Sequence, residues 1–125
     1  MKKLLNIALA STFILAASAP TFAEGDVKKG ERVFKKCKAC HSMVVGKRSL
    51  GPSLADVIGR TAGTLEGYKY SPAMKDSGVV WSAETLSEFL KKPRSFIKGT
   101  KMTFPGIRGG KADEQIADLV AFLQQ

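Results

Sequence analysis

The feature that most constrains this chain is a five-residue run that holds both of its cysteines and its single histidine, Cys37-Lys38-Ala39-Cys40-His41. Two cysteines are too few for a disulfide scaffold, and one histidine excludes a multi-histidine metal site. The chain has no further cysteine or histidine that could complete a zinc site with this run. The chemistry of the protein is therefore concentrated in these five positions.

A C-x-x-C-H run is typical of the covalent attachment of a c-type haem. Each thiol adds to one vinyl group of the porphyrin, and a two-residue gap on a helical turn brings both sulfur atoms to one edge of the ring. The following histidine then lies under the iron as its proximal ligand. A thioredoxin-like dithiol is the alternative, but it should follow a strand of a βαβ unit, and no such pattern is visible. We predict that Cys37 and Cys40 carry haem and that His41 ligates its iron.

The N-terminus has the layout of an export signal. Lys2 and Lys3 precede an apolar stretch, and small residues follow it up to Ala23, after which we predict cleavage. An uncleaved membrane anchor is the alternative, because about 20 apolar residues can span a bilayer. Removal of residues 1–23 leaves one domain, 24–125, of 102 residues and formal charge +7. The predicted compartment is the oxidising periplasm, where thioether formation would leave no free thiol.

The rest of the chain shows short helical segments, and no alternation of apolar and polar residues predicts a strand. The expected helix starts are the capping residues Asp26, Ser53, Ser71 and Ser82 and the acidic pair Asp113 and Glu114. The expected ends of the three middle segments are Gly59, Gly78 and Pro93. The expected inward faces are Val27, Gly30, Val33 and Phe34; Leu54, Val57 and Ile58; Leu86, Phe89 and Leu90; and Ile116, Leu119, Val120 and Leu123.

Long loops over residues 46–51, 59–67 and 99–110 contain most of the 12 glycines of the chain. A domain of this size with so little helix buries a modest core. A large prosthetic group at its centre would supply the apolar surface that the helices lack. The sequence therefore predicts an all-α fold whose loops wrap around one covalent haem.

One axial position of the iron remains, and the chain has no second histidine to fill it, so a methionine or a lysine fills it or it stays open. Three methionines remain after removal of Met1. Met43 is two residues from His41 and cannot reach the opposite face of the ring. Met74 falls in a short helical segment, where a core role is usual for methionine. Met102 lies in an irregular loop that can place a thioether at the iron, so it is favoured, with Met74 as the alternative.

Several short motifs match one known family in order and spacing. Those in the first half are Gly30, Phe34, Gly51-Pro52-Ser53-Leu54 and Gly59-Arg60. Those in the second half are Gly67-Tyr68-Lys69-Tyr70, Ser77-Gly78-Val79-Val80-Trp81, Gly99-Thr100-Lys101-Met102 and Ala117-Asp118-Leu119-Val120-Ala121-Phe122-Leu123. On these residues the chain resembles the class I c-type cytochromes, close to the mitochondrial type and its small soluble bacterial relatives. The resemblance implies about four to five short helices around one covalent haem.

The resemblance also implies residue roles. The Pro52 carbonyl would accept a hydrogen bond from His41 and so fix the imidazole tautomer. Met102 would be the second axial ligand. The residues implied to hydrogen-bond the haem propionates are Arg60, Tyr70 and Trp81, with Tyr68 and Thr100 nearby. The residues implied to let the first helix cross the last one are Gly30, Phe34, Leu119 and Phe122.

Two positions depart from the family pattern. Phe89 stands where the mitochondrial type has a tyrosine near the methionine sulfur, which removes a hydrogen bond to that sulfur. Met74 stands where the family often has an asparagine near buried water. The family's fine adjustment of the reduction potential therefore does not transfer to this chain.

The charge of +7 indicates a partner of opposite sign. Predicted export argues against nucleic acid and favours the acidic faces of redox proteins. The basic residues expected to form a docking ring around the haem edge are Arg32, Lys36, Arg94, Lys101 and Arg108. Those expected to be solvated charge are Lys28, Lys29, Lys75 and Lys111.

Together these features predict a monomeric periplasmic one-electron carrier without stable membrane insertion, and not an enzyme. Its partners stay open among a cytochrome bc complex, a terminal oxidase, a photosynthetic reaction centre, a peroxidase and a dehydrogenase. A haem catalyst or gas sensor is an alternative that needs an open axial position and distal acid–base residues, whereas the only histidine is used on the iron and Met102 is available as a ligand. A membrane-tethered carrier would use the same chemistry on an uncleaved anchor.

Overall fold

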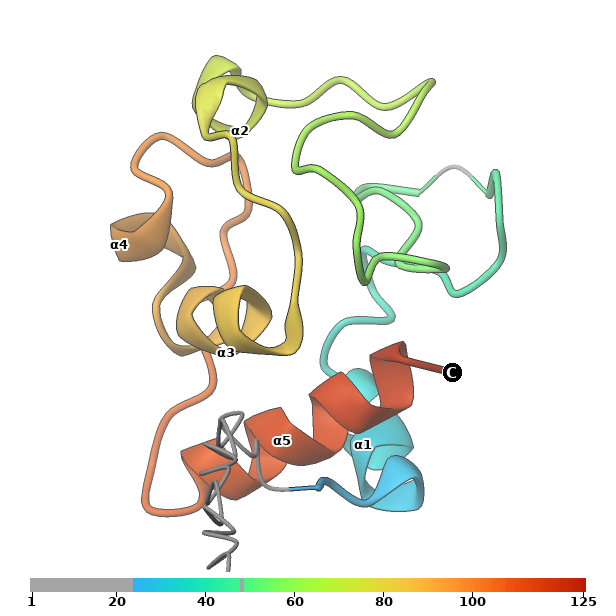
Figure 1. Cartoon of the computed structure of the whole chain (residues 1–125), viewed down its shortest axis with the longest axis vertical. Coiled ribbons are helices and arrows are strands. Elements are labelled where there is room, and N and C mark those ends of the chain that lie inside the picture. Colours follow the sequence, from blue (N-terminus) through green and yellow to red (C-terminus); the bar gives the residue numbers. More distant parts are fainter. Residues whose placement is uncertain (1–23, 48) are drawn as a thin grey trace, which may run out of the picture.

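The computed structural model describes residues 24–47 and 49–125, so the predicted export signal and its cleavage site lie outside the described residues. The helices are α1 (Val27–Phe34), α2 (Pro72–Asp76), α3 (Ala83–Lys91), α4 (Pro93–Phe96) and α5 (Ala112–Leu123). Among the described residues the only β pairing is an isolated bridge between Thr61 and Val80. The predicted all-α fold of short helices and long loops is confirmed (Figure 1).

Side-chain caps start three of these helices where the sequence predicts them. The Asp26 carboxylate accepts a hydrogen bond from the backbone N–H of Lys29, and Ser71 caps α2, which begins with a proline. Ser82 and Thr85 form a reciprocal capping box on α3. The last helix begins at Ala112, one residue before the predicted acidic turn. Local sequence therefore places most of the helical content.

The segment after Ser53 is not a helix, and this prediction is wrong. Its residues form turns, because the Ser53 hydroxyl accepts from the Ala55 N–H instead of capping a first helical turn. The same hydroxyl lies 2.9 Å from the carbonyl oxygen of Val44 and donates to it. Asp56 then takes a left-handed conformation with φ 55°, which ends any helix. Val57 of the predicted inward face is nevertheless buried.

Helix α4 is not predicted from the sequence. Pro93 was expected only to end the preceding helix, and α3 does end two residues before it, at Lys91. Proline also suits the first turn of a helix, because its missing N–H has no intrahelical partner there. One residue therefore both ends α3 and starts α4.

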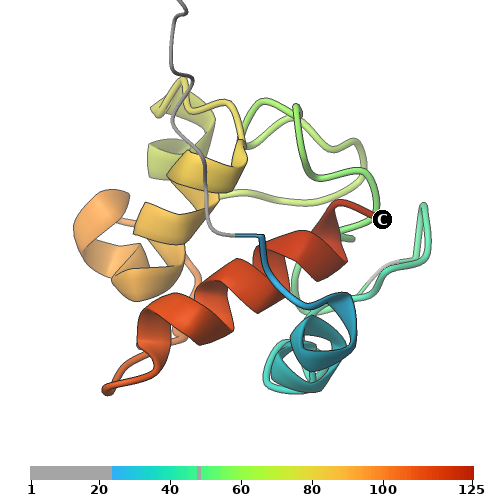
Figure 2. The ribbon, with the colours of Figure 1, turned by 60° about the horizontal axis from the view of Figure 1, so that its bottom comes forward.

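Helices α1 and α5 cross at the position that the resemblance implies (Figure 2). A Cβ on Gly30 would collide with the Asp118 carbonyl of α5, so only glycine allows this approach of the backbones. The Phe34 and Phe122 rings pack with centroids 5.2 Å apart. The buried Asp118 carboxylate accepts the Asp26 N–H at 2.7 Å and ties the start of α1 to α5.

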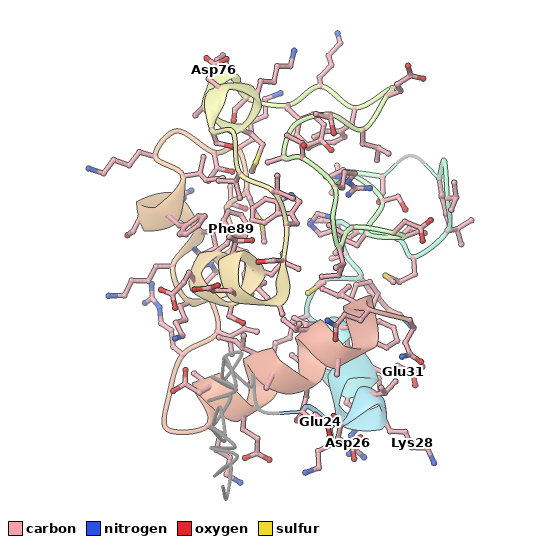
Figure 3. All side chains as sticks on the ribbon, viewed as in Figure 1. Glu24, Asp26, Lys28, Glu31, Asp76 and Phe89 are labelled. Carbon is pink, nitrogen blue, oxygen red and sulfur yellow. The ribbon has the colours of Figure 1, made fainter. Side chains whose placement is uncertain are left out.

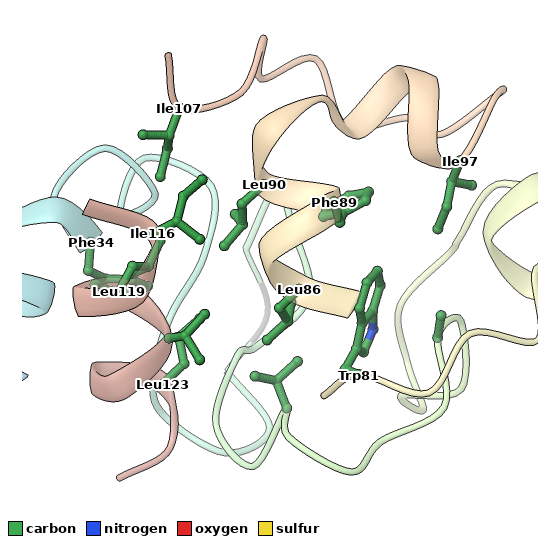
Figure 4. Close-up of a cluster of buried hydrophobic side chains, with 13 residues drawn as sticks. Phe34, Trp81, Leu86, Phe89, Leu90, Ile97, Ile107, Ile116, Leu119 and Leu123 are labelled. Carbon is green, nitrogen blue, oxygen red and sulfur yellow. The ribbon is translucent and has the colours of Figure 1, made fainter. Parts of the chain in front are cut away.

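The core links this helix pair to α3 (Figure 4). Its predicted members on α3 and α5 are buried, namely Leu86, Phe89, Leu90, Ile116, Leu119, Val120 and Leu123. Val27 was expected to face inward but is 37 % exposed. In Figure 1, α5 closes one end of the molecule, while α2, α3 and α4 lie on one side and the loops of residues 36–70 lie on the other. None of the helices in the described ranges is long and apolar enough to cross a membrane.

Candidate functional site

A cavity of about 440 Å³ lies between the helical side and the loop side of the molecule. Its volume is in the usual range for a ligand or cofactor site, about 300–1,000 Å³. Its apolar wall includes Leu54, Val57, Leu86, Leu90, Leu119 and Leu123. The core and the cavity therefore share residues, and a bound group would be surrounded by the core of the domain.

Every site residue predicted from the sequence lines this cavity. The set comprises Cys37, Cys40, His41, Pro52, Arg60, Tyr70, Trp81 and Met102. Tyr68, Thr100, Met74 and Phe89 line it as well. Residues up to 65 positions apart in the sequence thus surround a single space.

The C-x-x-C-H run forms a tight turn directly after α1. The backbone N–H groups of Cys40 and His41 both donate to the Cys37 carbonyl, at 3.0 and 2.9 Å. Both cysteines are free of a disulfide, with Cys37 half-buried and Cys40 exposed. Burial raises the pKa of the Cys37 thiol. Two unpaired thiols are therefore held on one turn at the edge of the cavity, as attachment to one ring edge requires.

The His41 ring is held in one orientation. Its Nδ1 lies 2.7 Å from the Pro52 carbonyl oxygen, and since a carbonyl can only accept, Nδ1–H is the donor. Burial lowers the pKa of His41, and Arg60 lowers it further, while the bond to Pro52 opposes both. The neutral imidazole therefore keeps its Nε2 lone pair for a metal.

Gly51 is a site residue that the sequence shows only as a family landmark. A Cβ at this position would come within 2.5 Å of His41 Cε1, so any larger residue would displace the ring. The Gly51 N–H also donates to the Cys40 carbonyl at 2.6 Å. The Gly51-Pro52 pair marked this position in the sequence as a family landmark. Its contact with His41 could not be read from the sequence, because the two residues are ten positions apart.

The loop of Met102 is fixed to its surroundings by backbone and side-chain bonds. The Met102 N–H donates to Thr100 Oγ1 at 3.3 Å, and Lys101 Nζ donates to the Lys69 carbonyl at 2.7 Å. Helix α2 touches the same loop, because a Cβ on Gly99 would lie 3.0 Å from Ala73 Cβ. Met74 of α2 and Met102 both line the cavity, and the choice of Met102 as the axial ligand stays a prediction.

The polar side chains expected near the haem propionates line the same cavity. Two of them, Arg60 and Tyr68, also donate hydrogen bonds to backbone carbonyl groups. Arg60 donates to the carbonyl groups of Ser53 and Ala55, at 2.8 and 3.3 Å, and keeps further donors free. The Tyr68 hydroxyl donates to the Leu50 carbonyl at 2.9 Å. Trp81 is 7 % exposed and lines the cavity. Burial raises the pKa of Tyr70. The propionate contacts of these residues stay predictions.

Phe89, which is labelled on α3 in Figure 3, is one of the residues that line the cavity, and its ring carries no hydroxyl group. Its ring centroid lies 5.0 Å from that of Trp81 and 6.2 Å from that of Phe96. These tilted and edge-to-face contacts hold the ring in place without a hydrogen bond.

Two of the five predicted docking residues lie at the cavity itself. Lys36 and Lys101 line it, whereas Arg32, Arg94 and Arg108 are exposed but not among its lining residues. Lys36 also donates to Gln115 at 3.2 Å. Lys29, expected to be solvated, lies 3.5 Å from Glu114 across the α1–α5 contact.

The donors at this cavity fit a covalently bound haem: two thiols on one turn, an oriented imidazole and thioethers, enclosed by apolar walls. No group of three or more His, Cys, Asp or Glu side chains suited to a metal ion occurs among the described residues. This fold and this site define a small c-type haem protein.

Comparison with known proteins agrees with that class. The family model described as cytochrome c matches residues 27–125, and the chain belongs to the cytochrome c family. The chain is 43 % identical to cytochrome c2 of Blastochloris viridis over 114 residues, which are 90 % of this chain and 87 % of that protein. It is 48 % identical to cytochrome c 2.1 of Caenorhabditis elegans over 101 residues, 80 % of this chain and 88 % of that one.

Among solved structures, cytochrome cH of Methylobacterium extorquens superimposes with a TM-score of 0.74 at 40 % identity. The match covers 80 % of this chain and 98 % of that one. Membership of the family confirms the predicted fold and the predicted cofactor, a covalently attached haem c with iron. The protein is an electron carrier of this family.

Proposed function

We propose that the protein is exported, cleaved after Ala23, and acts in the periplasm as a one-electron carrier built from residues 24–125. Thioethers from Cys37 and Cys40 would hold the haem, and His41 and Met102 would be its axial ligands. The observation that carries the proposal is that all four side chains line one apolar cavity. When bound, the haem iron supplies a one-electron couple.

The chain's own residues favour electron transfer over catalysis. His41 and Met102 would fill both axial positions, so no substrate could bind the iron. Methionine ligation raises the reduction potential. The fixed His41 ring and the hydrogen-bonded Met102 loop would change little between redox states, which favours fast transfer.

The proposed partners are redox proteins with acidic faces, for which Lys36 and Lys101 lie at the cavity. A cytochrome bc complex would be the donor, and a terminal oxidase or a photosynthetic reaction centre the acceptor. A peroxidase or a dehydrogenase fits the same surface.

Intact mass of the purified exported protein tests the proposal. We expect residues 24–125 plus one haem, and reversible uptake of one electron per chain in a redox titration. A disulfide-bonded chain without haem, or five-coordinate iron that turns over peroxide, would contradict it. N-terminal sequencing distinguishes cleavage after Ala23 from a retained anchor.

A further inference from the structure

A second cavity, of about 410 Å³, meets the proposed haem cavity at His41. Among the described residues, His41 is the only one that lines both cavities. The volume of the second cavity is in the range of small-molecule sites, about 300–1,000 Å³. The carrier function proposed above makes no use of this space.

The floor of the second cavity is aromatic. Phe34 of α1 and Phe122 of α5 line it, with their ring centroids 5.2 Å apart and their planes at 42°. Met43 lines the same floor. Phe34 is buried, whereas Phe122 and Met43 are half-buried and so keep surface that a bound group can cover. Aromatic rings and a thioether sulfur pack well against a further aromatic ring.

The rim of the second cavity has an excess of positive charge. Lys38 and Lys47 contribute two exposed ammonium groups, and Glu31 contributes one carboxylate. None of these three side chains forms an ion pair with another described residue. The hydroxyl groups of Ser42 and Ser49 add further donors to the lining. This rim favours an anion, and the two oxygens of a carboxylate can accept charge-assisted hydrogen bonds from both ammonium groups.

Both lysines project from backbone that hydrogen bonds hold in place. The Lys38 N–H donates to the Phe34 carbonyl at 3.2 Å, directly after α1. The Lys47 N–H donates to the Val44 carbonyl at 3.2 Å, and the Ser53 hydroxyl donates to that same carbonyl at 2.9 Å. The backbone positions are therefore set before a ligand arrives, so binding has to order only the two side chains.

We propose that the second cavity binds a small aromatic carboxylate, of which benzoate is the simplest example. The ring of the ligand would lie on Phe34 and Phe122. Its carboxylate would accept hydrogen bonds from Lys38 and Lys47. An inorganic anion would leave the aromatic floor in contact with water, and a neutral aromatic molecule would leave both ammonium groups without a partner.

Binding at this site would favour the oxidised state of the iron. This step rests on the proposed ligation by His41, which lines both cavities. The oxidised iron carries one more positive charge than the reduced iron, and a carboxylate beside His41 attracts that charge. We expect about threefold tighter binding to the oxidised protein. By linkage, saturating ligand then lowers the reduction potential by about 28 mV, at 59 mV for each tenfold change.

Titration of the haem-loaded protein with benzoate tests the site. Proton NMR of the reduced form should show saturable shifts of the Met43 methyl and Phe122 ring signals. The expected dissociation constant is about 1 mM, as is usual for so small a ligand. Shifts confined to Leu54 and Leu86, which line only the proposed haem cavity, would overturn the proposal.

Charge variants test the rim. Lys38→Gln or Lys47→Gln should each weaken benzoate binding about fivefold, and Glu31→Gln should tighten it about twofold. Lys35→Gln is the matched control, because Lys35 directly follows α1 and lines neither cavity. Equal losses from Lys35→Gln and Lys47→Gln would mean that net charge alone acts, and this would overturn the proposal.

Ligand analogues test the two halves of the site. Inorganic phosphate and benzyl alcohol should each bind about tenfold more weakly than benzoate, because each lacks one half of the match. Phosphate that binds as tightly as benzoate would show that the aromatic floor has no role and would overturn the proposal. Equal affinity of the oxidised and reduced protein for benzoate would overturn the coupling to the iron. Intact mass and haem content should stay unchanged in all variants, so failure here is distinct from failure of the proposed carrier function.

Discussion

The Nδ1 atom of His41 lies 2.7 Å from the carbonyl oxygen of Pro52, and the neighbouring Gly51 leaves no room for a side chain against the same ring. The hydrogen bond to Pro52 orients the imidazole, and the absence of a side chain on Gly51 leaves room for the ring in that orientation. Because Nδ1–H is committed to a backbone carbonyl, Nε2 is the nitrogen that can ligate iron.

Gly51→Ala should therefore destabilise the protein and disturb the iron ligand. The added methyl group would press on His41 Cε1, and overpacking of this kind costs about 1–3 kcal/mol of unfolding free energy. Denaturant unfolding measures the cost, and the proton NMR signals of His41 report the ring. Gly110→Ala is the control, because a Cβ there meets nothing within 4 Å. Equal effects of the two substitutions would show that Gly51 is not needed by the ring.

The identity of the second axial ligand can be decided by two matched variants. Met102→Ala should lower the reduction potential and abolish the sulfur-to-iron charge-transfer band of the oxidised protein. Met74→Leu should leave that band in place, since Met74 would only pack against the cavity wall. The opposite pattern would assign the ligand to Met74.

Phe89→Tyr should place a hydroxyl in the cavity near the proposed methionine ligand. A donor to the Met102 sulfur weakens its donation to oxidised iron, and therefore the potential should change. A net hydrogen bond contributes about 0.5–1.5 kcal/mol, and only its difference between redox states counts, so we expect about tens of millivolts at most. Phe96→Tyr is the control, because Phe96 meets the Phe89 ring edge to face without lining the cavity. An unchanged potential and spectrum would mean that the Phe89 ring does not face the sulfur.

The cap of α1 gives an acid-dependent contribution to stability. The Lys29 N–H holds the pKa of the Asp26 carboxyl below its usual value. The pKa of Asp26 is lower in the folded chain than in the unfolded chain, where it is near 3.8. The stabilisation from the ionised cap is therefore fully present above pH 3.8, and it is lost as the pH falls through the folded-state pKa. Asp26→Asn keeps a capping side chain but removes this titration. Unfolding free energies measured from neutral pH down into this range should fall less steeply for Asp26→Asn, and parallel curves would contradict the assignment.

The parts of the fold that the sequence predicts are those set by neighbouring residues. The caps Asp26, Ser71 and Ser82 bond within three positions, and the C-x-x-C-H turn is contained in five. Ser53 has the same local signal, but its hydroxyl bonds to the Val44 carbonyl nine residues earlier, and the predicted helix is replaced by turns. A side chain with two possible partners cannot be assigned from its immediate neighbours.

The site also has one part that is set by neighbouring residues and another that is set by residues far apart in the sequence. The attachment motif is local, whereas the restraint of the Met102 loop is not, because Lys101 Nζ bonds to the Lys69 carbonyl 32 residues earlier. The exposure of Val44 and Val45, 59 % and 74 %, also carried no sequence signal, since an apolar pair in a loop is equally consistent with burial. Exposure became evident only from the folded backbone.

Lys101 was predicted as a member of a docking ring, and its bond to Lys69 changes how that ring should be tested. Lys101→Glu would remove both a rim charge and a restraint on the Met102 loop, so a slower electron transfer could have either cause. Lys36 is the better probe, because it lines the same cavity and its exposed ammonium donates to Gln115 of α5 and not to the Lys69 carbonyl that holds the Met102 loop. The charge-transfer band of Lys101→Glu then reports any loosening of the loop.

Lys36→Glu should slow electron transfer to an acidic partner at low salt, and Lys75→Glu should have little effect, because Lys75 does not line the cavity. Rim charges act mainly on the association rate, and complementary charges raise it by about 10-fold to 1,000-fold at low salt. The Debye length falls from about 30 Å at 0.01 M salt to about 10 Å at 0.1 M, so the wild-type rate should drop steeply over that range and approach that of Lys36→Glu. Stopped-flow rates across this salt series give the measurement. If Lys36→Glu and Lys75→Glu slow the reaction equally, net charge and not a localised ring governs the encounter. A rate that rises with salt would mean that the partner's surface is not acidic.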